Sequence, residues 1–237
     1  MTSRRRCPIA TYKRLPRGKD KSHDEFKDWT LHVMLWLRKH WTTAIEVVAL
    51  CMVVFAVVVG ASAYGQHKAR SAAEKLYELE KSSPKTDEKI DQLESIADKY
   101  SRTFAGKYAL MELGGLLLEE GNFQAAAKHF MMLADGSRNQ PMFRIAALHR
   151  LADVQLAAGD PAEAAKTFRK AAADPHNELA LYSELMAAAC LERANDYDSA
   201  AKLYEMIIED AGEYDVAVRE VSEERLLWLY AKGYNAS

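Results

Sequence analysis

The stretch LGGLLLEEGNFQAAAKHFMML at residues 113–133 decides the fold, because the same pattern returns twice along the chain. It reappears as LADVQLAAGDPAEAAKTFRKA at 151–171 and as AAACLERANDYDSAAKLYEMI at 187–207. Each copy has a small residue, then a turn residue, an alanine and an aromatic residue at constant spacing. The small residues are Gly114, Ala152 and Ala188, the turn residues Gly121, Gly159 and Asn195, the alanines Ala126, Ala164 and Ala200, and the aromatic residues Phe130, Phe168 and Tyr204.

This spacing predicts a helix–turn–helix unit. The small residues and the alanines let two helices approach closely, and the aromatic side chain fills the space between units. Glycine and asparagine tolerate the left-handed backbone conformation that ends a helix. The pattern resembles the tetratricopeptide repeat, whose unit has about 34 residues. Here the copies are 38 and 36 residues apart. We therefore expect an all-α solenoid of tetratricopeptide-like helical hairpins over residues 67–237.

Both ends of the repeat region show weaker copies of the pattern. Leu93, Ile96 and Ala97 lie where the aromatic and apolar residues of an earlier unit belong, and 69–81 is expected to be the first helix of that unit. Residues 215–232 are predicted to be helical without a small-residue signature. We interpret that helix as a cap, because terminal repeats expose one face to water and are atypical.

A long apolar run precedes the repeats. The sequence AIEVVALCMVVFAVVVGASAYG at 44–65 has 22 residues, and Glu46 is its only charged residue. At 1.5 Å rise per residue it is long enough to cross a hydrocarbon core of about 30 Å. We predict a single N-terminal transmembrane helix at 42–66. A buried core helix and a cleaved signal peptide are less favoured alternatives, since the run is long and has little polarity. A lipoprotein signal is less favoured because the large Leu50 precedes Cys51 and the apolar run continues after it.

Charge divides sharply about this run. Residues 1–66 carry a net charge of +6 and residues 67–237 a net charge of −8. The positive-inside rule places 1–41, a basic arm followed by an interfacial helix, in the cytoplasm and the repeats across the membrane. We expect a bacterial inner-membrane protein with a periplasmic domain. A mitochondrial inner membrane is the alternative, because the first 19 residues contain arginines and no acid. The arm suits anionic lipid, and no motif indicates nucleic acid.

No arrangement of residues points to catalysis. The three cysteines are widely separated, no phosphate-binding glycine loop occurs, and the seven histidines form no metal-ligand spacing. We predict a protein that is not an enzyme and has no catalytic residues, metal site or cofactor. An enzyme whose site the sequence does not reveal is the alternative from another class.

A groove for a protein partner is the remaining candidate site. In helix-pair repeats the first helix of each unit usually lines the inner face of the solenoid. Ordinary packing between repeats is the alternative role for each residue there. The candidates are Tyr108, Met111, His149, Asp153, Tyr182 and Leu185.

The whole layout resembles one membrane-protein family. A short cytoplasmic segment with Asp24-Glu25-Phe26, one span, an Ala/Leu-rich helix and about three divergent repeats is similar to the bacterial YfgM family, ancillary subunits of the SecYEG translocon. The resemblance implies an adaptor that hands emerging proteins to periplasmic chaperones or assembles envelope complexes. Its partners are then a translocon, a chaperone or a client protein. An accessory structural subunit of another membrane complex, for example respiratory or photosynthetic, is the alternative function.

Overall fold

Every regular element of the described chain is helical. The computed structural model describes residues 33–36, 38–82, 85–213 and 215–234. The all-α prediction is confirmed for these residues. The expected basic arm at 1–23 and most of the interfacial helix, including Phe26 and Trp29, lie outside the described residues. The chain divides into two units, Met1–Ser62 and Ala63–Ser237, which are described separately below.

Helix α2 (Trp41–Ser82) contains the apolar run and extends well beyond it. Its most apolar 18-residue window has a mean hydropathy of 2.7, and none of that window is buried by the described residues. The helix is therefore long and apolar enough to cross a membrane. The helix expected at 69–81 runs directly out of the apolar run, because α2 continues without a break to Ser82. In the second unit, Ala72 and Leu79 of α2 belong to the buried core.

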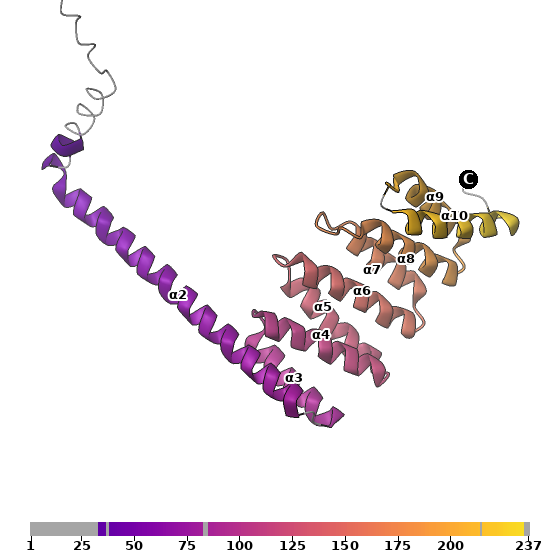
Figure 1. Ribbon diagram of the computed structural model, residues 1–237, viewed down its shortest axis with the longest axis horizontal. Helices are drawn as coiled ribbons and strands as arrows, with labels where there is room; N and C mark the ends of the chain where they lie inside the picture. The colour runs from indigo at the N-terminus through magenta and orange to yellow at the C-terminus, as the bar shows by residue number, and fades with distance from the viewer. Residues whose placement is uncertain (1–32, 37, 83–84, 214, 235–237) are drawn as a thin grey trace, which may run out of the picture. The chain divides into compact units, whose positions relative to one another are not determined.

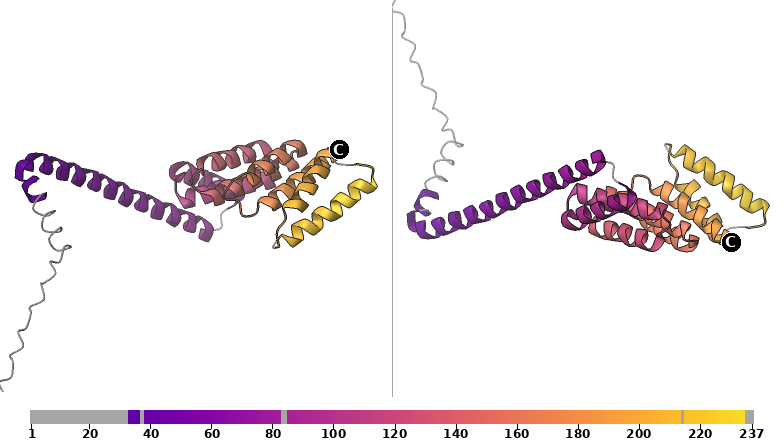
Figure 2. Two further views of the ribbon diagram at one scale, coloured as in Figure 1. Left: turned by 90° about the horizontal axis from the view of Figure 1, so that it is seen from above. Right: turned by 90° about the horizontal axis from the view of Figure 1, so that it is seen from below.

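The remaining helices form consecutive pairs. α3 packs against α4, and each later helix packs against the next one in the chain (Figure 1). The views in Figure 2 show the same succession, with α10 at the end of the stack. The hairpins α4–α5, α6–α7 and α8–α9 confirm the predicted units. Their bounds are α3 (Thr86–Tyr100), α4 (Phe104–Glu119), α5 (Phe123–Gly136), α6 (Pro141–Ala157), α7 (Pro161–Ala172), α8 (Ala180–Arg193), α9 (Tyr197–Asp210) and α10 (Val216–Ala231).

The positions selected from the repeat pattern form the core. All the small residues, alanines and aromatic residues named above are buried. The three turn residues have positive φ angles: 76° at Gly121, 89° at Gly159 and 61° at Asn195. The left-handed conformation expected at the end of each first helix is therefore present in every unit.

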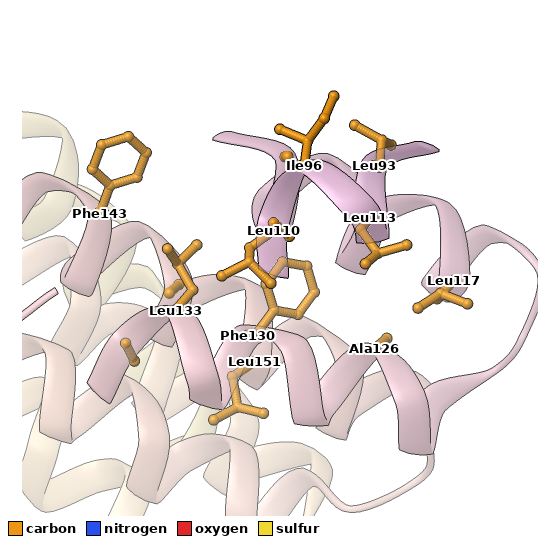
Figure 3. Packing of buried hydrophobic residues seen from close by; sticks show 14 of the residues in the cluster. Leu93, Ile96, Leu110, Leu113, Leu117, Ala126, Phe130, Leu133, Phe143 and Leu151 are labelled. Carbon is orange, nitrogen blue, oxygen red and sulfur yellow. The ribbon is translucent and has the colours of Figure 1, made fainter. Parts of the chain in front are cut away.

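Gly114 shows why the small residue is required. A Cβ atom placed on Gly114 would lie 2.6 Å from Cζ of Phe130, well inside van der Waals contact. Phe130 is fully buried, and Figure 3 shows its ring among Leu110, Leu113 and Leu133. Because interiors are packed at crystal-like density, the ring has little space into which to retreat. The aromatic residue of α5 thus occupies the space that the missing side chain leaves on α4.

Helix α10 carries a packing residue that the sequence pattern did not reveal. Ser222 is fully buried, 34 residues after Ala188, and its hydroxyl donates a hydrogen bond to the Val218 carbonyl at 2.8 Å. The expected absence of a small-residue signature in 215–232 is therefore wrong at this position. The exposed surface of α10 is mixed, because it carries Glu220 and Glu223 together with exposed apolar residues such as Leu227 and Trp228.

Candidate partner-binding groove

A cavity of about 640 Å³ opens between α6 and the start of α8. Its apolar wall includes Met142, Ile145, Ala146 and Leu179. Met142 and Leu179 are each 65% exposed, which is unusual for large apolar side chains beside a cavity. We call this feature the α6–α8 cavity. Its volume lies within the range of small-ligand and side-chain binding sites.

One wall of the α6–α8 cavity is the loop 173–179 between α7 and α8. Asp174 accepts a hydrogen bond from Arg144 Nε at 2.5 Å, and its other oxygen accepts one from the His176 backbone amide at 3.0 Å. Burial opposes ionisation of Asp174, but these hydrogen bonds dominate and hold its pKa below the usual range. Asn177 donates to the Ala171 carbonyl at 2.8 Å. The loop is therefore pinned to α6 and to the end of α7.

Ser183 joins this loop to His149. Its hydroxyl lies 3.2 Å from the Leu179 carbonyl and 3.0 Å from Asn177 Nδ2, so it donates to the first and accepts from the second. His149 Nε2 lies 2.8 Å from the same oxygen. Which of the two groups donates depends on the tautomer of His149. Burial lowers the pKa of His149, and the ring is neutral at pH 7.

His149 also contacts two aromatic rings. Tyr182 stacks on it with a centroid separation of 6.3 Å, and Phe168 meets it edge-on at 5.3 Å. Tyr182 is 43% exposed, so its other face is open to solvent. The structure thus brings His149 and Tyr182 together at the edge of the α6–α8 cavity. His149 has a structural anchoring role there, and Tyr182 presents the accessible surface.

Asp153 lies one helical turn after His149 and lines the same cavity. Its carboxylate is 3.7 Å from Arg150 Nη1. Burial raises the pKa of Asp153, while Arg150 and His149 act in the opposite direction. Among the described residues, Arg150 is the one ion-pair partner of the half-buried Asp153 carboxylate. At this distance it offsets only part of the cost of burying the negative charge.

Tyr108 and Met111 lie on α4, away from the α6–α8 cavity. Both are half-buried, and Met111 packs against the core. Glu112 and, more weakly, Glu80 raise the pKa of Tyr108, together with burial. No ring contact joins Tyr108 to Tyr182 among the described residues. The repeat spacing places Ala146 between them, so the structure does not bring the two tyrosines together.

Leu185 lines a second cavity, of about 460 Å³, between α8 and α10. Val221 and Trp228 of α10 supply much of its apolar lining. We call this feature the α8–α10 cavity. Trp228 is 41% exposed and lies beneath the Arg225 guanidinium, which is 5.0 Å from the ring centroid.

A buried ionic cluster holds α10 beside this cavity. Glu192 is almost fully buried and accepts a hydrogen bond from the Tyr204 hydroxyl at 2.6 Å. Arg225 Nε donates to the same carboxylate oxygen at 2.9 Å, and Arg225 Nη2 donates to the other oxygen. Burial, reinforced by Glu192, raises the pKa of Tyr204. A bidentate arginine on a desolvated carboxylate is among the stronger polar contacts in proteins.

Sequence reasoning named His149, Asp153 and Leu185, which line the two cavities, but missed other lining residues. Met142, Leu179, Val221 and Trp228 lie outside the repeat's packing positions. The sequence did contain a signal for them. Each is a large apolar residue at a position that the repeat pattern does not require to be buried. The described residues contain no cluster of three or more potential metal ligands. Burial raises the pKa of the Cys190 thiol to about 11, so this cysteine is unreactive near neutral pH.

Comparison with known families agrees with this architecture. A tetratricopeptide repeat-like domain model matches residues 35–180, and a tetratricopeptide repeat model matches residues 155–220. No curated protein and no solved structure matches the chain. Repeats of this kind are typical of protein-interaction scaffolds that are not enzymes. Because the first match covers more than half of the 237 residues, the chain belongs to the tetratricopeptide repeat-like domain family.

Proposed function

We propose that this protein is a membrane-anchored scaffold that holds a polypeptide segment of its partner against the first helices of its repeats. The α6–α8 cavity is the observation that carries this proposal. It lies between the first helix α6 and the loop that leads into the first helix α8. Exposed Met142 and Leu179 line it, and exposed Tyr182 stacks on its lining residue His149. Exposed apolar side chains around a cavity are a feature of protein interaction sites.

Helix α2 is the proposed membrane anchor. Its apolar window and the +6/−8 charge division support a bacterial inner-membrane protein with a cytoplasmic N-terminus and a periplasmic repeat domain. The resemblance to the YfgM family supports an adaptor role in protein translocation, chaperone hand-off or envelope assembly. In that role a translocon, a chaperone or a client protein is the partner.

The topology predicts a defined protease result. Protease added to spheroplasts should digest the repeat domain at 67–237 and leave the N-terminal arm intact, because only the domain faces outward. Antibodies against tags at the two ends, followed by immunoblotting, measure this. Lysed spheroplasts provide the control in which both ends are digested. A repeat domain that resists protease until the cells are lysed contradicts the proposed topology.

Partner capture should depend on the α6–α8 cavity. Met142→Glu places a charge at the rim of the cavity and is expected to reduce capture about tenfold, as does the loss of an interface anchor. The matched control is Met131→Glu, which changes a 47% exposed methionine on the second helix α5. Quantitative mass spectrometry of proteins purified with the full chain in mild detergent measures capture. Equal recovery of every partner by Met142→Glu and the wild type contradicts the proposed site.

A further inference from the structure

The loop that lines the α6–α8 cavity ends where α8 begins, and α8 itself lines the α8–α10 cavity from Leu185 to Arg193. Tyr182 stacks on His149 at the edge of the α6–α8 cavity, and Leu185, about one turn later on α8, lines the α8–α10 cavity. Helix α6 and the loop before α8 line the first cavity, and residues of α8, α9 and α10 line the second. An extended segment that runs along α8 can therefore place one side chain in each cavity. This argument rests on the proposed function, since it concerns the occupant of the same surface.

The first cavity has an uncompensated negative charge at its rim. Arg150 lies near Asp153, and Asp174 is paired with Arg144, so these carboxylates each face an arginine. Glu178 is exposed on the pinned loop and makes no ion pair with any other described residue. The free charge at this end is therefore negative.

The second cavity has the opposite charge. Glu192 is neutralised by Arg225, which leaves Arg193 as an exposed lining residue that forms no ion pair within the described parts of the chain. Lys232, with Nζ 5.7 Å from the Trp228 ring centroid, adds a second cation nearby. The net charge of the residues that line this cavity is therefore positive, although the exposed Glu224 lies on α10 and the repeat region as a whole is acidic.

We infer that the occupant is an extended segment of a partner protein with a basic residue opposite Glu178, an acidic residue opposite Arg193 and two large apolar side chains between them. Glu178 and Arg193 are separated by most of α8, about 20 Å at 1.5 Å per residue. An extended chain covers this distance in about six residues. The two charges fix the direction in which the segment lies, because the reversed segment meets like charge at both ends.

Selection from a library of displayed random 12-residue peptides tests this inference. The full chain in lipid nanodiscs is the target. Wild-type protein should enrich peptides with two large apolar residues between one basic and one acidic residue, in a single order and about six residues apart. Glu178→Lys should select an acidic residue in place of the basic one, and Arg193→Glu the converse. Lys202→Glu, an exposed change on the second helix α9, is the matched control that should leave the preference unchanged.

Affinity of a synthetic peptide from the selection makes the test quantitative. By fluorescence anisotropy, Glu178→Lys and Arg193→Glu should each weaken binding about fivefold, as expected for exposed charges. Reversing the facing peptide charge should restore the affinity. A charge preference unaffected by either variant overturns the inference, as does failure to enrich any peptide.

The outcomes separate the inference from the proposed function. If Met142→Glu abolishes peptide selection but the two charge reversals change nothing, the cavity stands and the assigned charges are wrong. If peptides selected on the wild type bind Met142→Glu equally well, they bind elsewhere, and both the cavity and its assigned occupant are wrong.

Discussion

Gly114→Ala is expected to destabilise the repeat domain by about 1–3 kcal/mol, the usual cost of overpacking a filled core. The added methyl group would lie 2.6 Å from the buried Phe130 ring, so either the ring or helix α4 must move. Gly114→Leu should cost at least as much. Ala164→Leu, at the fully buried alanine position of the second helix α7, should cost a similar amount.

The neighbouring glycine provides the matched control. A Cβ atom on Gly115 has no atom within 4 Å, so Gly115→Ala introduces no clash. It should stabilise α4 by up to about 1 kcal/mol through helix propensity. Urea unfolding of the full chain in detergent micelles, followed by circular dichroism, measures both free energies. If Gly114→Ala and Gly115→Ala change the free energy of unfolding by the same amount and in the same direction, our assignment of the helix–helix contact is incorrect. Phe130→Leu should partly rescue Gly114→Ala, because it removes the clashing atoms.

Arg225→Met is expected to destabilise α10 by about 2 kcal/mol. Glu192 is then left as a buried carboxylate with only Tyr204 as a partner, and an unpaired buried charge typically costs about 3–5 kcal/mol. The smaller value is expected here because Arg225 is 41% exposed and water can reach the site. Hydrogen exchange of the backbone amides of α10, measured by mass spectrometry on the full chain, reports the effect.

A double variant separates loss of the ion pair from loss of packing. Glu192→Leu combined with Arg225→Met removes both charges, and a buried pair replaced by apolar residues is often neutral in stability. The double variant should therefore recover most of the protection that Arg225→Met loses. Tyr204→Phe, which removes one hydrogen bond to Glu192, should cost about 1 kcal/mol. Unchanged exchange in α10 for Arg225→Met would mean that the cluster does not hold the helix.

The ionic cluster also has a consequence for binding. Val221 and Trp228 line the α8–α10 cavity only while α10 remains packed against α8 and α9. Loss of the Glu192–Arg225 contact therefore removes one of the two proposed pockets without altering the α6–α8 cavity.

The amino-acid sequence by itself determined the helical hairpins and their register. Gly114, Ala126 and Phe130 recur at equivalent positions in each unit, and helix geometry converts that spacing directly into contacts between neighbouring helices. The sequence also predicted the apolar helix of α2, because length and composition alone define a helix that is able to cross a membrane. These features depend on residues close together in the chain.

Only the tertiary structure decided the shape of the candidate site. His149 and Tyr182 were selected as partner contacts, yet His149 is an anchor for Ser183, and Leu185 faces a different cavity. The pinned loop 173–179 and the Glu192–Arg225 contact join residues up to 33 positions apart. Their geometry depends on how helices stack and which side chains that stacking leaves exposed. Helical periodicity places a residue on a face, but it does not specify what lies opposite that face.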